Sequence, residues 1–380
     1  MINFKSKLEG GTSIFSVMSK LSAEYNALNL GQGFPNYDCD NKLKLLVHEH
    51  LNNNRNQYAQ SAGVIELRRA IAQKIKLTYG TEVSPDSEVT ITAGATQALF
   101  SIINSFVHAG DEVIIIEPAY DSYRPAIELS GGQVVPYRLR GPDFRIDWDK
   151  IASLISDKTR MIIINTPHNP TGKIMTEADM QALQTLVSGT NILVLSDEVY
   201  EHLIYDRRLH LSVLRYPKLY EQSIAVYSFG KTFHATGWKM GYCVGPEYLT
   251  REVRSHHQWN VFSVNSFIQY ALAEYLSDPD SYINLSGFYE SKRDYLGEVM
   301  KGSNLRALPC EGTYFQLFDY SEISDLSDIA FARKMIIEHG VAGIPLSPFY
   351  SDRRDIKYIR LCFAKSEELL DKAGKLLRKL

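Results

Sequence analysis

The stretch SFGKTF at residues 228–233, followed by GWKMGY at 237–242, decides the fold that we expect for this chain. The apolar run 224–226 precedes it and predicts a short buried strand that ends in a glycine-flanked loop carrying Lys231. Taken alone, Lys231 and Lys239 are expected to be solvated, because lysine is seldom buried. If the two amines lie close together, the charge of Lys239 lowers the pKa of Lys231, and a neutral amine can attack a carbonyl carbon.

Further apolar runs alternate with helical patterns along most of the chain. Such alternation predicts an α/β fold with a predominantly parallel sheet that is covered by helices on both faces. Ligands of these folds collect at the carboxyl ends of the strands, so the loops that follow the runs form the candidate site. The runs lie at 89–92, 113–116, 161–164 and 192–195.

Each of these loops carries a residue suited to ligand binding. The turn at Gly94, where a helix begins, offers free N–H groups to an anion, although such turns are common in α/β proteins. Tyr120 can stack on a flat ring or lie at the rim of the core, and Asn169 can donate to a phenolic oxygen. Asp197 follows a buried strand directly, so it needs a cationic partner unless it caps a helix.

Two stretches near the ends of the chain also fit a ligand site. The run NLGQGFP at 29–35 allows the backbone to approach a ligand without an intervening side chain, or it is a plain turn. In the apolar run 358–363, Arg360 is costly to bury without an anion, and its forked donors suit a carboxylate. A structural salt bridge is the competing interpretation of Arg360.

Length and composition describe a chain of 380 residues with one or two domains. The net charge of −3 offers no basic surface for nucleic acid or for a membrane. The apolar runs are too short to span a bilayer, and residues 1–11 lack the apolar core of a signal peptide. The 4 scattered cysteines indicate free thiols in a cytoplasmic protein and no metal site.

Together these motifs resemble the class I aminotransferases that depend on pyridoxal 5'-phosphate (PLP), over nearly the whole chain. In that family a Ser-x-x-Lys motif is followed by Gly-x-Arg/Lys-x-Gly, and lysine at position 239 resembles the branch of kynurenine, glutamine and methionine aminotransferases. The runs 92–96, 120–123 and 359–364 are similar to bacterial methionine aminotransferases within that branch.

The resemblance implies the PLP-dependent transferase fold, fold type I, with a mostly parallel seven-stranded sheet in the large domain. It implies an N-terminal arm at 1–35, which belongs to the small domain and covers the active site. The large PLP-binding domain is expected at 36–282, and a smaller α+β domain at 283–380.

The resemblance also implies a role for each matching residue, with Lys231 as the catalytic residue that links to PLP and moves the α-proton. The residues expected to contact the cofactor are Gly94, Ala95, Thr96, Tyr120, Asn169, Asp197, Tyr200, Ser228, Lys231 and Lys239, with Tyr58 from the partner of a homodimer. The residues expected to contact the substrate are Phe15, Gly33, Asn169 and Arg360, with Phe262 from the partner.

The implied reaction moves an amino group from an amino acid to a 2-oxo acid by a ping-pong mechanism. Aspartate-type enzymes take a second arginine from the partner, and the matching region 257–265 has none, so apolar amino acids such as methionine and aromatic amino acids are expected. Glutamine and kynurenine are further candidates. The kynurenine branch carries an aromatic residue where Thr96 and Ala119 stand, which predicts that kynurenine is a poor substrate.

Two alternatives use the same fold. A PLP-dependent C–S β-lyase shares each cofactor contact and differs in its products, which are pyruvate and a thiol. A non-catalytic regulator with an aminotransferase-like sensor domain would carry an additional DNA-binding module. The pattern begins within a few residues of the start of the chain, and no basic helix is apparent, so this regulator is disfavoured.

Overall fold

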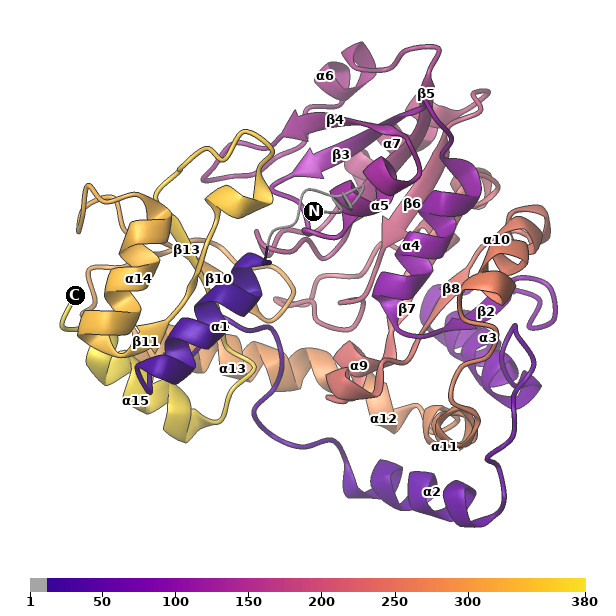
Figure 1. Ribbon diagram of the computed structural model, residues 1–380, viewed down its shortest axis with the longest axis horizontal. Coiled ribbons are helices and arrows are strands. Elements are labelled where there is room, and N and C mark those ends of the chain that lie inside the picture. Colours follow the sequence, from indigo (N-terminus) through magenta and orange to yellow (C-terminus); the bar gives the residue numbers. More distant parts are fainter. Residues whose placement is uncertain (1–11) are drawn as a thin grey trace, which may run out of the picture.

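A seven-stranded mixed sheet forms the centre of the computed structural model, which describes residues 12–380 (Figure 1). The strands are β2 (Val89–Thr92), β3 (Glu112–Glu117), β4 (Gln133–Arg138), β5 (Thr159–Asn165), β6 (Leu193–Asp197), β7 (Ser223–Ser228) and β8 (Gly241–Val244). Their order is β2-β8-β7-β6-β5-β3-β4. Strand β8 is antiparallel to both neighbours, and the other neighbouring strands are parallel. The predicted, mostly parallel sheet is therefore confirmed.

Side chains of the central strands alternate between two hydrophobic cores, one on each face of the sheet. Ile115 and Ile163 belong to one core, whereas their neighbours Ile114 and Ile162 belong to the other. Because successive side chains of a strand point to opposite faces, continuous apolar runs indicate a sheet that is buried on both sides. This burial accounts for the runs of isoleucine and valine in the sequence.

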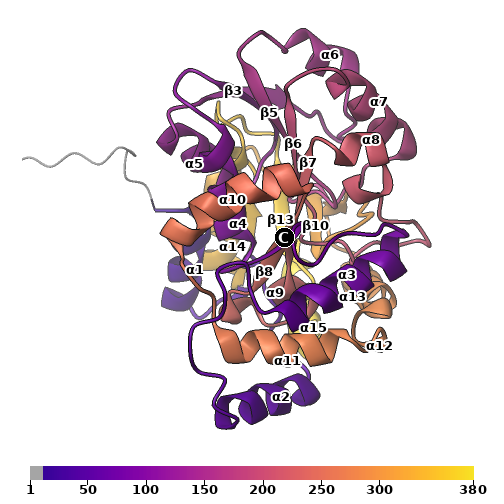
Figure 2. The same cartoon turned by 90° about the vertical axis from the view of Figure 1, so that its right-hand side faces the viewer.

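Helices cover both faces, as the expected α/β fold requires. One face packs against α4 (Ala95–Phe106), α5 (Tyr123–Leu129) and α10 (Glu247–Asn260). The other face packs against α3 (Ile65–Tyr79), α7 (Glu177–Val187), α8 (Pro217–Tyr220) and α11 (Ser266–Leu276). Figure 2 shows α4, α5 and α10 on one side of the strands, and α7 and α8 on the other. We call this part of the molecule the large lobe.

A second sheet and its helices form a separate lobe with its own core, which we call the small lobe (Figure 1). Its strands β9 (Arg306–Ala307), β10 (Phe315–Asp319), β12 (Ile344–Pro345) and β13 (Tyr358–Cys362) form an antiparallel sheet in the order β12-β13-β10-β9. Helices α13 (Leu285–Val299), α14 (Asp328–His339) and α15 (Glu367–Leu377) pack against this sheet.

The first described elements also join the small lobe. Strand β1 (Leu28–Asn29) pairs in parallel with β11 (Val341–Ala342), and helix α1 (Ile14–Glu24) packs beside α14. The chain therefore leaves the small lobe after β1, builds the large lobe, and returns. The segment that contains Gly33 begins at the end of β1 and lies between the two lobes.

One predicted helix differs from the structure. The pattern between residues 277 and 300 predicts a single long helix, whereas the chain forms α12 (Asp280–Ile283) and then α13. The break is at Asn284, whose backbone angles of −92° and 2° lie outside the helical region. Asparagine favours such a position because its side chain competes for backbone hydrogen bonds.

Three further helices complete the fold: α2 (Asn41–Asn52), α6 (Trp148–Ser153) and α9 (Phe229–Thr232). Across residues 12–380, no helix has the length and apolar character needed to cross a membrane. The stretch 1–11, where we expect no signal peptide, lies outside the described residues.

Candidate active site

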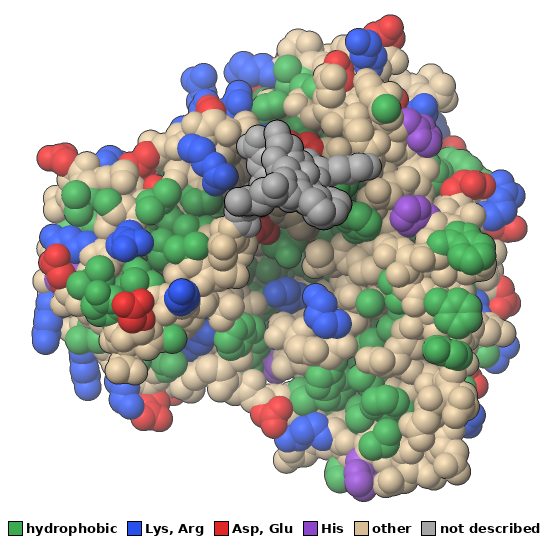
Figure 3. Space-filling model, in the orientation of Figure 1, with side chains coloured by type: hydrophobic (Ala, Val, Ile, Leu, Met, Phe, Trp, Pro, Cys, Tyr) green, Lys and Arg blue, Asp and Glu red, His purple; other side chains and the backbone are tan. Residues whose placement is uncertain are grey.

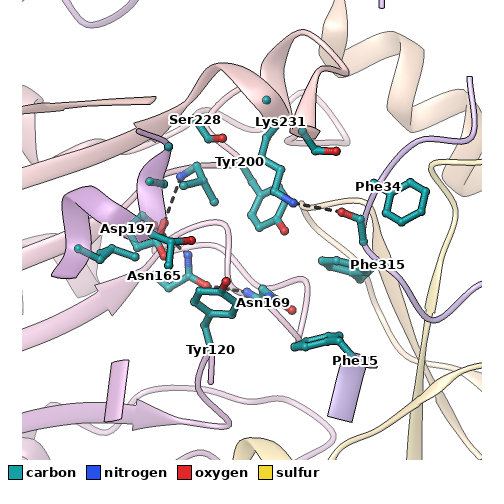
Figure 4. Close-up of a pocket in the computed structure, with 18 of the residues that line it drawn as sticks. Phe15, Phe34, Tyr120, Asn165, Asn169, Asp197, Tyr200, Ser228, Lys231 and Phe315 are labelled. Atoms are coloured by element: carbon teal, nitrogen blue, oxygen red, sulfur yellow. Dashed lines mark hydrogen bonds between the residues drawn. The ribbon is translucent and has the colours of Figure 1, made fainter. Parts of the chain in front are cut away.

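A cavity of about 290 Å³ lies at the carboxyl ends of the parallel strands, where the two lobes meet. The space-filling view shows this face of the molecule hollowed between the lobes (Figure 3). The cavity brings together candidate residues that are far apart in the sequence, namely Phe15, Gly33, Gly94, Ala95, Thr96, Tyr120, Asn169, Asp197, Tyr200, Ser228, Lys231, Lys239 and Arg360. Figure 4 shows Lys231, Tyr200, Asp197 and Tyr120 facing one another across this space.

Lys231 reaches the cavity from α9, the short helix that begins directly after β7. Its Nζ donates to the carbonyl oxygen of Gly33 at 3.1 Å and to the hydroxyl oxygen of Tyr314 at 2.7 Å. Burial lowers the pKa of Lys231 to about 8, and the charges of Arg360 and Lys239 add to the lowering. Lys239 therefore acts as expected, but burial has the larger effect.

The turn after β2 forms an anion-binding surface with Lys239. Gly94 has a φ of 81°, a left-handed conformation that favours glycine, and it directly precedes helix α4. A side chain at Gly94 would lie 3.5 Å from the amine of Lys239. At Gly241, an added Cβ would lie 2.8 Å from the backbone nitrogen of Ala95, so only glycine permits this close packing. The N–H groups at the start of α4 and the Lys239 amine thus lie together.

Asp197 ends strand β6 and is buried, as its position after an apolar run predicts. Its carboxylate accepts hydrogen bonds from the Tyr123 hydroxyl at 2.6 Å and from the backbone N–H of Val199 at 3.4 Å. Burial raises the pKa of Asp197 to about 6. Within the described part of the chain these partners are neutral, so the expected cationic partner is not a side chain that donates to this carboxylate.

Arg360 projects from β13 of the small lobe and is 1% exposed. It donates to the side-chain oxygen of Asn169 at 2.7 Å and to the carbonyl oxygen of Gly31 at 2.9 Å, and its guanidinium lies 3.7 Å from the ring centre of Phe315. Among residues 12–380, its Nε has no hydrogen-bond partner. Burial lowers the pKa of Arg360 to about 10. Its described partners are neutral oxygens, which does not match the salt-bridge interpretation.

Tyr58 and Phe262 are not brought to the cavity of their own chain. Tyr58 is 83% exposed and Phe262 is 56% exposed, and their rings meet edge to face at 5.2 Å. Large aromatic side chains with this exposure are available for contact with another molecule. Their assignment to the site of a partner subunit stays a prediction.

Several residues that support the site were not predicted from the sequence. Tyr123 donates to Asp197, and Asn165 donates its side-chain amide to the Asp197 carbonyl at 2.8 Å while it accepts from the backbone N–H of Asn169. Asn165 lies at the carboxyl end of β5, so the reasoning applied to Asp197 applies to it equally. Tyr123 lies at the start of a helix, where an aromatic residue is more often part of the core.

Two further residues, Tyr314 and Phe315, belong to the small lobe. An added Cβ at Gly33 would lie 2.5 Å from the Phe315 ring, so this ring explains why glycine is needed at position 33. The run 314–317 reads simply as a strand of the small domain, and its alternation does not identify which residue meets the large lobe. A contact between lobes leaves no local signal in the sequence.

The chain matches the family model described as aminotransferase class I and II over residues 25–376. It is 49% identical to a methionine aminotransferase of Escherichia coli (strain K12), over 97% of this chain and 96% of the relative. It is 34% identical to a kynurenine–oxoglutarate transaminase of Dictyostelium discoideum, over 97% of this chain and 94% of the relative.

Solved structures give the same picture. A crystal structure of an Escherichia coli protein identified as a methionine aminotransferase superposes with a TM-score of 0.98 at 49% identity, covering 100% of both chains. An N-succinyldiaminopimelate aminotransferase of Mycobacterium tuberculosis gives a TM-score of 0.95 at 32% identity, covering 99% of this chain and 100% of the other. With matches of this extent in sequence and structure, the chain belongs to the class I and II aminotransferase family.

Proposed function

We propose that the protein is a PLP-dependent aminotransferase that takes methionine and aromatic amino acids as donors and a 2-oxo acid as acceptor. The observation that carries this proposal is the cavity, because Lys231, Arg360 and several aromatic rings all line it. The similarity to a methionine aminotransferase along 97% of the chain supports the choice of donor.

The cavity residues fit PLP, which combines a phosphate, a flat pyridine ring, a phenolic oxygen and an aldehyde. Asp197 is a buried carboxylate whose described hydrogen-bond donors are neutral, and a protonated ring nitrogen would supply the cation that it needs. The turn at Gly94, together with Ser228 and Lys239, would hold the phosphate. Tyr120 would stack on the ring. When bound, PLP supplies an electron sink for the carbanion that proton removal leaves.

Asn169 and Tyr200 suit the phenolic oxygen. Asn169 is 7% exposed, and the Tyr200 ring is 3% exposed with its centre 5.7 Å from the Lys231 amine. An amide N–H and a phenol O–H are both donors that such an oxygen accepts. The side-chain oxygen of Asn169 is already used by Arg360, so its N–H₂ group is left to face the ligand.

The chain's own residues divide the remaining work. Arg360 binds the substrate α-carboxylate, for which its partner-free Nε in the described structure is suited. This contact fixes the α-carbon relative to Lys231. The Lys231 amine removes the α-proton as a general base and would then deliver it to a carbon of the cofactor. A pKa of about 8 leaves a useful fraction of the Lys231 amine neutral near pH 7. The same residues act in the reverse direction on the 2-oxo acid.

Apolar walls favour an apolar donor. Phe15 lies edge to face with Phe349 at 5.8 Å, and with Phe315 it surrounds the guanidinium of Arg360. In a homodimer, the exposed pair of Tyr58 and Phe262 would complete the site from the partner, with Tyr58 near the phosphate. Phe15, Tyr58 and Phe262 would then enclose the donor side chain.

The test is an amino-acid panel on the PLP-loaded protein, with cofactor absorbance and 2-oxo acid production followed together. We expect methionine and aromatic amino acids to convert the cofactor to its aminated form, and an added 2-oxo acid to restore the starting spectrum. Aspartate is the matched control and should react much more slowly. Release of pyruvate from cystathionine, without any aminated cofactor from the panel, would replace this proposal with the C–S β-lyase.

A further inference from the structure

Tyr314 joins the catalytic lysine to the small lobe. Its hydroxyl donates to the carbonyl oxygen of Gly33 at 2.5 Å and lies 2.7 Å from the Nζ of Lys231. Because the hydroxyl proton is used on Gly33, the Tyr314 oxygen acts as an acceptor for an N–H of Lys231. Lys231 also donates to the same Gly33 carbonyl at 3.1 Å, so the three groups form a closed triangle.

The Tyr314 ring is fixed firmly enough to define a position for the amine. It is 0% exposed, and its centre lies 5.2 Å from Tyr200, 4.8 Å from Phe315 and 5.9 Å from Tyr289. A ring held on several sides cannot change its rotamer without displacing its neighbours. By contrast, Lys231 has a flexible four-carbon chain that needs external contacts to hold its amine in one place.

The members of the triangle come from different parts of the fold. Lys231 lies on α9 of the large lobe, Gly33 on the segment after β1, and Tyr314 directly before β10 of the small lobe. Lys231 lines the cavity, whereas Tyr314 is not among the described residues that line it. The Tyr314 hydroxyl therefore contacts the Lys231 amine from behind the cavity wall. The amine therefore has a holding position that is built by the small lobe.

We propose that Tyr314 is a positioning residue, which holds the free amine of Lys231 for its work as the general base. This inference rests on the proposed function, since it needs Lys231 to be released as a free amine during each half-reaction. The acceptor oxygen of Tyr314 orients the lone pair of the amine and favours its protonated form. Without that oxygen, the amine keeps Gly33 as a partner but samples more orientations.

The substitution Tyr314→Phe removes the hydroxyl and leaves the packed ring in place. The matched control is Tyr289→Phe, because Tyr289 is 0% exposed in the same lobe and, in the described structure, its hydroxyl forms no hydrogen bond with Lys231 or Gly33. Both variants lose one oxygen from a buried aromatic ring. Equal thermal unfolding midpoints in the two variants establish that the comparison concerns the amine and not the fold.

The first measurement uses the cofactor-free protein, in which the pH dependence of Lys231 labelling by an amine reagent is followed by mass spectrometry. A hydrogen bond to a charged group is strong enough to move the labelling midpoint by about one pH unit. We expect the midpoint to fall by about that amount in Tyr314→Phe and to stay in place in Tyr289→Phe. An unchanged midpoint in Tyr314→Phe overturns the inference.

The second measurement uses the PLP-loaded enzyme. Tyr314→Phe should lower kcat about tenfold, as expected for a base that is still present but less well oriented, while KM for the donor changes less than about twofold. A rise in KM with unchanged kcat would instead assign Tyr314 to substrate binding and contradict the inference. If the parent enzyme fails the amino-acid panel, the proposed function fails, and the labelling experiment still reports the Tyr314 contact separately.

Discussion

Two regions of the large lobe each combine a lysine, a buried carboxylate and tyrosines, and they differ in how these groups are paired. Behind the sheet, Lys74 donates to Glu201 at 2.5 Å, and both side chains are 2% exposed. Tyr79 also donates to Glu201, and Tyr242 lies 3.1 Å from the Lys74 amine. At the carboxyl ends of the strands, Lys231 and Asp197 have no such mutual hydrogen bond in the described structure.

The two carboxylates respond oppositely to their surroundings. Burial by itself would raise the pKa of Glu201, but the charge of Lys74 reverses the effect and brings that pKa down to about 2. Burial of Asp197 is not reversed in this way, and its pKa rises to about 6. Paired ions of this kind support structure, whereas unpaired groups at a cavity are available to a ligand.

The largest effect should come from removing the cavity lysine. We expect Lys231→Ala to lower kcat by about 10⁴-fold or more, because it deletes the group that we propose moves the α-proton. The fold should persist, since Lys231 is only half-buried and forms no ion pair among the described residues. Turnover at saturating methionine is the measurement, with thermal unfolding as the control. Near-normal turnover would show that Lys231 and Lys74 do not differ in the way proposed.

The next effect comes from the paired lysine. Lys74→Met should lower the free energy of unfolding by about 3–5 kcal/mol, because it leaves Glu201 charged and buried without its partner. The control is Lys76→Met, which breaks the exposed pair with Glu82 and should cost less than about 1 kcal/mol. Urea denaturation of both variants provides the measurement. Equal losses would contradict the structural assignment of Lys74.

A smaller effect is expected at Arg360, the cavity cation whose Nε has no hydrogen-bond partner among the described residues. Arg360→Lys keeps a positive charge but loses the forked geometry, so kcat/KM for methionine should fall about 100-fold, mainly through KM. The exposed residue Arg353 supplies the control, since Arg353→Lys should leave both constants within about twofold. A fall in kcat alone would move Arg360 from carboxylate binding to another role.

The smallest effect is a difference in pH dependence between the two carboxylates. The folded-state pKa of Asp197, about 6, lies above the ordinary aspartate value of 3.8, so the cofactor-free protein loses stability as the pH rises between these two values. Replacing Asp197 with asparagine removes this loss. The free energy of unfolding of Asp197→Asn, relative to the parent, should therefore rise by about 1 kcal/mol between about pH 5 and about pH 7.5.

The matched variant for this experiment is Glu201→Gln. The folded-state pKa of Glu201, about 2, lies below the ordinary glutamate value of 4.5, so its stabilising effect is complete above about pH 5 and is lost only in more acidic solution. Its difference from the parent should stay constant over the same interval. Urea unfolding of both variants and the parent at the two pH values provides the measurement. An Asp197→Asn free energy of unfolding that keeps a constant difference from the parent would contradict the raised pKa of Asp197.

Local sequence patterns were sufficient to predict most of the fold. The apolar runs predicted the central strands because a strand buried on both faces needs apolar side chains at every position, and this is visible without tertiary information. The turn at Gly94 and the loop at Lys231 were visible for a similar reason, since glycines and strand ends mark where the backbone turns. The helix break at Asn284 was missed because its neighbours continue the helical period.

By itself, therefore, the sequence determined the α/β class, the mostly parallel sheet and the strand ends at which a ligand site forms. Only the tertiary structure decided which charges are paired. Lys74 and Glu201 are separated by 127 positions, and Lys231 and Tyr314 by 83, so no local period links them. Burial and charge pairing depend on which distant segments meet, and these contacts distinguish the lysine that supports the fold from the lysine proposed to act in catalysis.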